Sequence, residues 1–197
     1  MKILFLHISD MHIKNKDGIN GFQIKKIADS INQLGAFEQI LLIISGDIAY
    51  SGHRIQYEHA WHAIGQLITA INKSSSKKYH IHVLCVPGNH DIDQGNDALA
   101  SSQLQKILKE NQCGKYYQNE LCKQHAFYNF ADRNHCFKNN SAFYRSILKF
   151  DDFVIEANLI NSAIFSSLEE GKGLHYLPQA CINELEVYGK ELVFNNY

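Results

Sequence analysis

Three short polar clusters, each directly behind an apolar run, carry side chains that can bind a cation or move a proton. They are SDMH at residues 9–12, SGD at residues 45–47 and VPGNHDID at residues 86–93. Carboxylates and imidazoles together suit zinc, manganese or iron better than calcium. Each cluster taken alone also fits a polar turn or a chance pairing, because Pro, Gly, Asn and Asp are turn residues.

The first two clusters supply carboxylates. In an extended segment, side chains two residues apart point the same way, so Asp10 and His12 could converge on one ion. In the second cluster, Gly46 removes a side chain that would hold the backbone away from the site. Asp47 offers two oxygens that can bridge a pair of cations.

The third cluster adds an amide and a second imidazole. Asn89 can give a neutral carbonyl oxygen to a metal, and His90 can hold a phosphate oxygen or protonate a leaving alkoxide. Two roles stay open for Asp91, which are orienting His90 and capping a following helix. Capping is favoured slightly, because Asp is a preferred N-cap residue.

The apolar runs before the clusters predict three buried strands, over residues 2–8, 39–45 and 80–86. Between them, apolar residues recur at three- and four-residue steps, which predicts two amphipathic helices. The order favours an α/β fold with a parallel sheet, whose strands all end at one edge, where ligands usually bind. The helix residues are Ile24, Ile27, Ile31 and Leu34, then Tyr57, Trp61, Ile64, Ile68 and Ile71.

The rest of the chain has weaker patterns. Apolar spacing predicts helices over residues 100–108 and from about 119 to 134, and more weakly over 179–190. Residues 143–150 and 153–160 are predicted to form two strands joined as a hairpin. Gly171 and Gly173 mark a loop.

Composition excludes several classes of protein. The chain has 197 residues, of which 45% are hydrophobic, enough for one domain with a real core. The formal net charge of −1 gives no overall basic field for nucleic acid or an anionic membrane. No apolar stretch reaches membrane-spanning length, and residues 1–10 lack the features of a signal peptide. The five cysteines have no Cys-x-x-Cys pair, which favours reduced thiols in the cytoplasm.

The three clusters, in this order and each behind a strand, resemble the motifs of the calcineurin-like metallophosphoesterase superfamily, which are Asp-x-His, Gly-Asp and Gly-Asn-His-Asp. The resemblance is strong over residues 1–93, and the hairpin ending at residues 161–162 resembles the family's next strand. It implies a sandwich of two β-sheets flanked by helices. Residues 1–197 would then form the N-terminal portion of one metallophosphoesterase domain.

By position, the resemblance implies two divalent cations, of manganese, iron or zinc. Asp10 and His12 would hold the first ion, Asp47 would bridge both, and Asn89 would hold the second. Two such cations neutralise a phosphate and turn bound water into a nucleophile near neutral pH. The predicted site residues are Asp10, His12, Asp47 and Asn89 for the metals, Asn89 and His90 for the substrate phosphate, and His90 and Asp91 for catalysis.

The family also supplies later histidines, some from a Gly-His-x-His segment, and this sequence has no such segment. His125, His135 and His175 lack the family's context. Residues 174–197 resemble the helix before the strand that carries the next histidine. We therefore expect a longer parent protein with a C-terminal remainder and a second sheet that is incomplete here. Without those imidazoles the site would be open, so this stretch alone could be inactive.

Three functions stay open. The leading one is hydrolysis of a nucleotide-like phosphodiester or phosphomonoester, because a near-neutral chain shows no sign of tracking a polyanion. The second is a metal-dependent DNA or RNA nuclease, in which basic and aromatic side chains face nucleic acid. The alternative for these side chains is that the aromatic rings fill the core and the lysines are solvated. The third is a non-catalytic protein-binding scaffold. The residues that would support the nuclease are Lys109, Lys115, Tyr116, Tyr117 and Lys123.

Overall fold

A computed structural model gives the architecture of the chain. The structure describes residues 1–18, 21–34, 37–75, 78–93, 95, 106, 113–134, 136, 141–166 and 192–196. Within these ranges the side chains are described except at positions 21, 22, 74, 113–116 and 192–196.

The first sheet contains the three strands predicted from the apolar runs, β1 (Ile3–Ile8), β2 (Gln39–Ser45) and β3 (His80–Val86). They are parallel, in the order β1-β2-β3, so the prediction of a parallel sheet is confirmed. The register pairs Ile8 with Ile44, and Ile44 with Cys85. The three strands therefore end level with one another, and the polar clusters that follow them leave the sheet at one edge.

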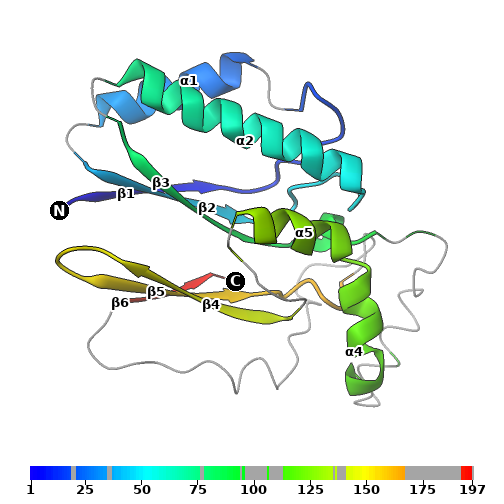
Figure 1. Ribbon diagram of the computed structural model, residues 1–197. Coiled ribbons are helices and arrows are strands. Elements are labelled where there is room, and N and C mark those ends of the chain that lie inside the picture. The colour runs from blue at the N-terminus through cyan, green and yellow to red at the C-terminus, as the bar shows by residue number, and fades with distance from the viewer. Residues whose placement is uncertain are drawn as a thin grey trace.

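Two helices cover one face of this sheet, α1 (Gly21–Gln33) and α2 (Arg54–Ser74), as predicted (Figure 1). Both lie on the same face because consecutive parallel strands joined by right-handed crossovers place their helices on one side. A buried cluster joins the two helices to the sheet, including Ile31 of α1 and Ile71 of α2. No helix among the described residues is both long enough and apolar enough to cross a membrane.

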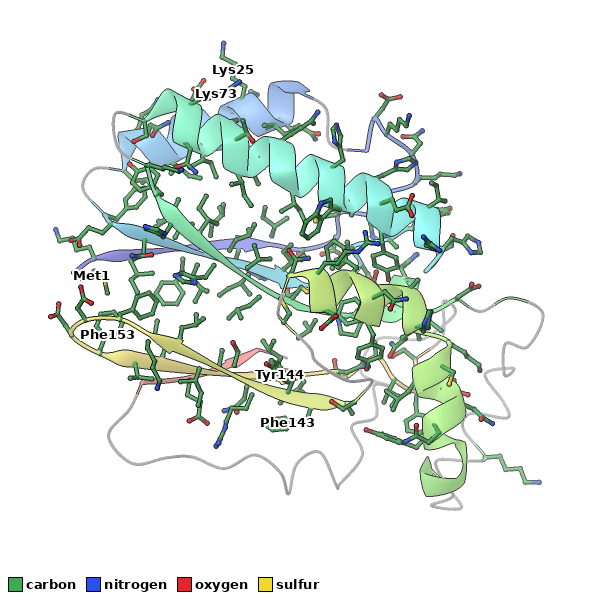
Figure 2. The ribbon with its side chains drawn as sticks, in the orientation of Figure 1. Met1, Lys25, Lys73, Phe143, Tyr144 and Phe153 are labelled. Carbon is green, nitrogen blue, oxygen red and sulfur yellow. The ribbon has the colours of Figure 1, made fainter. Side chains whose placement is uncertain are left out.

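The second sheet packs against the opposite face of the first (Figure 1). Strands β4 (Phe143–Lys149) and β5 (Val154–Ile160) form the predicted antiparallel hairpin, and β6 (Leu192–Asn196) pairs parallel with β5. Side chains fill the space between the sheets, with Ala157 and Leu159 of β5 fully buried (Figure 2). The α/β sandwich is confirmed. Strand β6 was not predicted, since its residues belong to the segment likened to a helix.

The helix predicted from about residue 119 to 134 is two helices, α4 (Cys113–Cys122) and α5 (His125–Arg133). The chain leaves the helical path at Lys123, whose carbonyl accepts a hydrogen bond from Asp93 N at 2.9 Å. The helices predicted over residues 100–108 and 179–190, and the loop at residues 171–173, lie outside the described residues, apart from position 106.

Candidate metal centre

Backbone hydrogen bonds tie the loop after β1 to the loop after β2. Asp10 N donates to Gly46 O at 3.3 Å, and His12 N donates to Asp47 O at 2.8 Å. The first polar cluster therefore runs alongside the second, and its carboxylate and imidazole are held next to Asp47.

Three predicted metal ligands have a strained backbone. The φ angles of Asp10, His12 and Asp47 are 54°, 45° and 53°, and among the described residues no other residue except glycine has a positive φ. Such conformations persist only where the surroundings fix them, and they cluster at functional sites. The expectation that Asp10 and His12 converge because their segment is extended is wrong, since both residues are left-handed. Their side chains are nevertheless close, with Asp10 Oδ1 3.9 Å from His12 Nε2.

The carboxylate of Asp91 joins the loop after β2 to the loop after β3. It is fully buried, and it accepts hydrogen bonds from Ala49 N at 2.8 Å, Ile48 N at 3.1 Å and Gly88 N at 2.9 Å. The hydroxyl of Tyr57 donates a fourth bond at 2.7 Å. Burial raises the pKa of Asp91, while these hydrogen bonds act to lower it. Burial and the Asp91 carboxylate both raise the pKa of Tyr57.

This position does not fit the predicted catalytic role of Asp91. Its two oxygens are used by four donors, and the residue sits inside a short 3₁₀ turn, η1 (Asn89–Asp91), which it caps through Gly88 N. The following helix that Asp91 was expected to cap lies outside the described residues. The residue that orients His90 is Tyr50, whose carbonyl oxygen lies 2.8 Å from His90 Nδ1. Asp91 is thus a positioning residue for the loops that carry the site.

The hydrogen bond to Tyr50 also fixes the tautomer of His90. A carbonyl oxygen can only accept a hydrogen bond, so Nδ1 of His90 must carry the proton. In the neutral ring Nε2 is then free of a proton and able to bind a metal or accept a proton.

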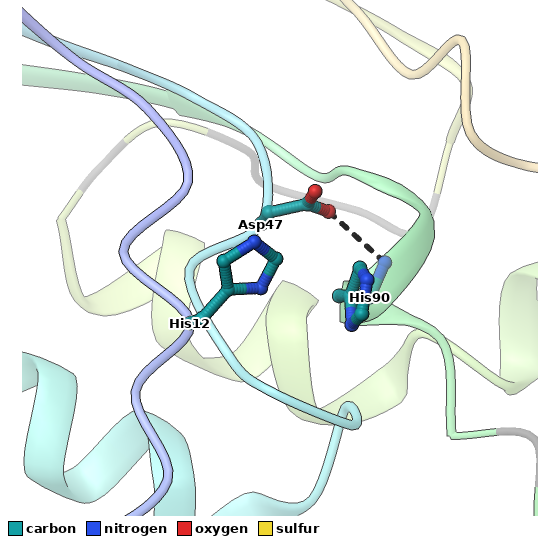
Figure 3. A group of neighbouring side chains, drawn as sticks. All are labelled: His12, Asp47 and His90. Atoms are coloured by element: carbon teal, nitrogen blue, oxygen red, sulfur yellow. Dashed lines mark hydrogen bonds between the residues drawn. The ribbon is translucent and has the colours of Figure 1, made fainter. Parts of the chain in front are cut away.

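Three side chains gather closely enough to hold one metal ion. One ligand atom from each of His12, Asp47 and His90 lies within 4.8 Å of the others (Figure 3). His90 N donates to Asp47 Oδ1 at 3.0 Å, and the rings of His12 and His90 meet edge to face at 4.5 Å between centroids. His12 Nδ1 is buried without a hydrogen-bond partner among the described residues. Buried polar atoms are normally paired, and a divalent cation bound by this set of nitrogen and oxygen ligands would explain the exception at His12.

A pocket of about 170 Å³ adjoins this cluster. Asp10, Asp47 and Asn89 all line it, so Asp47 belongs both to the three-residue cluster and to the pocket. A Cβ atom at Gly88 would overlap the Asp47 carboxylate, so only glycine lets the third loop come this close. The remaining lining residues are Ser45, Gly46, Val86, Pro87, Gly88, Ser162, Ala163 and Ser166.

The structure therefore brings the predicted residues of all three clusters to one edge. It also shows two features that the sequence did not predict. His90 was predicted to face the phosphate, but it also lies within the three-residue cluster, and an imidazole suits both roles. Ser162 and Ser166 reach the pocket from the loop after β5. Neither carries a motif, and the only signal for them was the likeness of the hairpin end to the family's next strand.

A buried polar network holds that second-sheet loop. Asn161 donates from Nδ2 to Gln124 Oε1 at 2.5 Å and to Tyr128 Oη at 2.8 Å, and its Oδ1 accepts from Ala163 N at 3.1 Å. Of the later histidines, His125 is exposed on α5 beside Asn129. His135 and His175 lie outside the described residues.

Comparison with known proteins agrees with this arrangement. A family model described as calcineurin-like phosphoesterase matches residues 3–190 of the chain. The match covers all three polar clusters and the hairpin of the second sheet. A search of curated proteins found no match.

Proposed function

Because the chain belongs to the calcineurin-like phosphoesterase family, we propose that it hydrolyses a nucleotide-like phosphodiester or phosphomonoester with the help of two divalent cations. The observation that best supports two ions is the position of Asp47. It is shared by the cluster with His12 and His90 and by the pocket with Asp10 and Asn89. A carboxylate shared by two sets of ligands supports the proposed bridging role.

We assign Asp10 and His12 to one ion, Asn89 to the other, and Asp47 to both. When bound, the cations supply neutralisation of the phosphate charge and a lowered pKa for water. His90 is proposed to act in its doubly protonated form, in which Nδ1–H stays bound to the Tyr50 carbonyl and Nε2 gives its proton to the leaving oxygen. Manganese, iron and zinc all suit this set of ligands.

The contacts in the described part of the chain give no support to the nuclease alternative. The hydroxyl of Tyr117 accepts a hydrogen bond from Ala142 N at 2.9 Å, and Lys123 Nζ lies 2.8 Å from Glu120 Oε1. Both side chains are therefore used in holding the fold. The side chains of Lys109, Lys115 and Tyr116 lie outside the described set. Nuclease and scaffold functions remain outcomes of the test below.

The test is hydrolysis of a chromogenic diester, a cyclic nucleotide and single-stranded DNA by the chain with Mn²⁺. We expect Asp47→Asn to lower kcat/KM on the small esters by about 100-fold or more, because ligand loss removes both cations. Asp29→Asn, an exposed carboxylate on α1, is the matched control and should behave as the wild type. Activity that survives a chelator would contradict the proposal, and activity on DNA alone would favour a nuclease. Silence on all three substrates, from a protein that also carries the expected later histidines, would favour a scaffold.

His90 is tested separately from the metal ligands. If His90 is the proton donor, His90→Gln should lower kcat by roughly 100-fold while the affinity for Mn²⁺ changes little. If it is instead a ligand, Mn²⁺ affinity should fall about as far as in Asp47→Asn. Isothermal titration of Mn²⁺ into the two variants distinguishes these results.

A further inference from the structure

A lysine and an exposed tyrosine lie beside the candidate metal centre, and none of the roles above uses their side chains. Tyr50 is 45% exposed, which is high for a large aromatic side chain. The Tyr50 ring lies 6.1 Å from the His90 ring between centroids, and Lys14 Nζ lies 4.8 Å from the centroid of the Tyr50 ring. The Tyr50 ring therefore contacts both His90, which belongs to the metal cluster, and the exposed Lys14.

The backbone holds these residues in place. Tyr50 N donates to Ile13 O at 3.1 Å, and Ile13 forms a parallel β-bridge with Ala49. Ile13 is only 1% exposed, so the segment carrying Lys14 is anchored in the core. The Tyr50 carbonyl in turn holds the His90 ring. The backbone at Lys14 and Tyr50 is therefore held next to the His90 loop by contacts between the loops that build the metal centre.

The charge of Lys14 is available to a ligand. Within the described part of the chain it forms no ion pair, and its ammonium lies over the aromatic face of Tyr50. A cation–π contact at an exposed site contributes only about 0.5–1 kcal/mol, and it leaves N–H donors of the ammonium for other partners. A lysine next to a cation-binding site does not help to hold the cations, so its charge suits an anion.

We propose that Lys14, positioned by Tyr50, binds a second phosphate group carried on the leaving group of the substrate. This inference rests on the proposed function. His90 is proposed to face the reacting phosphate, and Lys14 and His90 both contact the Tyr50 ring, so we assign to Lys14 a group attached to that phosphate. The preferred substrates are then phosphoanhydrides such as nucleoside diphosphates, rather than esters with a neutral leaving group.

The chemical step itself is unchanged by this assignment. Water adds its oxygen to phosphorus and releases one proton to solvent, the bond from phosphorus to the bridging oxygen breaks, and that oxygen takes the Nε2 proton of a doubly protonated His90. Lys14 takes part only in binding, through charge-assisted hydrogen bonds to the oxygens of the second phosphate.

The kinetic test compares kcat/KM for a nucleoside 5′-diphosphate with kcat/KM for a bis-aryl phosphate, each with Mn²⁺. Lys14→Gln should lower the ratio of the two values about tenfold, because it removes one charge-assisted contact. Lys14→Arg should largely preserve the ratio. Tyr50→Leu should lower it while Tyr50→Phe, which keeps the ring, should not. Lys16→Gln removes an equal charge from the same exposed segment and should match the wild type.

A binding measurement gives a readout that does not depend on turnover. Inorganic pyrophosphate titrated into the Mn²⁺-loaded chain should bind about tenfold more weakly to Lys14→Gln than to Lys16→Gln. An unchanged ratio and an unchanged pyrophosphate affinity would overturn the assignment of Lys14 and leave the proposed function standing. If the wild type hydrolyses neither substrate but pyrophosphate affinity still depends on Lys14, the anion site is supported although the proposed function is not.

Discussion

His12 shows how a single residue reports on function through its backbone. Its φ of 45° lies in the left-handed region, which costs an L residue about 1–2 kcal/mol relative to the right-handed one. A glycine would meet no such cost, yet the sequence has an imidazole there, and a buried nitrogen of that imidazole has no hydrogen-bond partner among the described residues. The residue type at position 12 is therefore better explained by ligand binding than by stability.

The strain at position 12 can be measured with two variants that both remove the imidazole. His12→Gly should be more stable than His12→Ala by about 1 kcal/mol, because only alanine keeps a Cβ in the left-handed conformation. Urea unfolding in the presence of a chelator gives both free energies without a contribution from metal binding. Equal stabilities would mean that this backbone is not strained.

Asp91 is the second residue whose role depends on its contacts rather than on its type. Asp91→Asn should lower the free energy of unfolding by about 3 kcal/mol, because an amide nitrogen would replace an oxygen that accepts backbone N–H groups. Tyr57→Phe removes only one of the four donors and should cost about 1 kcal/mol. Chemical denaturation of the two variants checks this order, and a harmless Asp91→Asn would contradict the role of Asp91 in joining the loops.

At the scale of residues, the sequence indicated which side chains could bind a metal, but not which groups donate hydrogen bonds to them. The clusters at Asp10, Asp47 and Asn89 could be recognised because short motifs carry ligand chemistry. The four donors to Asp91 could not be recognised from the sequence, since they come from the chain between residues 48 and 88 and meet only in the folded molecule. The local preference of Asp for N-cap positions carries no information about these distant donors.

At the scale of elements, the level ends of β1, β2 and β3 place the three clusters together. Those strands, α1, α2 and the hairpin were predictable because buried elements have clear apolar periodicity. The break between α4 and α5 was not predicted, because the contact found there, from Asp93 N to Lys123 O, joins residues far apart in the sequence. Strand β6 was missed because a short strand ending a weakly patterned segment gives little periodic signal.

The interface between the two sheets should make stability depend on pH. His82 of β3 packs edge-on against Phe150, with 5.4 Å between the ring centroids, and partial burial, followed by the charge of His80, lowers its pKa from the usual 6.5. A lowered folded-state pKa means that the unfolded chain binds the proton more readily. Its contribution to stability is therefore present above pH 6.5 and lost as the pH falls through that value toward the folded-state pKa.

Replacing His82 should remove this part of the pH dependence. The Tm of His82→Gln should fall less steeply than that of the wild type between pH 7 and pH 5. His62→Gln, which removes an exposed histidine of α2, controls for the loss of a histidine elsewhere. Thermal unfolding monitored by circular dichroism gives the three curves, and parallel curves for His82→Gln and the wild type would contradict the assignment.

At the scale of the whole molecule, both sheets contribute to one edge. The loops of the parallel sheet carry Asp10, Asp47 and Asn89, and the loop after β5 adds Ser162 and Ser166 to the same pocket. The near-neutral net charge of −1 fits a small substrate better than a polyanion. The later histidine ligands, the longer parent protein and the cytoplasmic location stay predictions.

The central claim is that Asp47 bridges two cations at this edge. The most direct measurement is anomalous X-ray scattering from crystals of the chain grown with Mn²⁺, with crystals of Asp47→Asn as the control. We predict two manganese peaks in contact with the Asp47 carboxylate, one toward His12 and one toward Asn89, and weaker or absent peaks in the variant. Manganese bound elsewhere, with none at Asp47, would contradict the account.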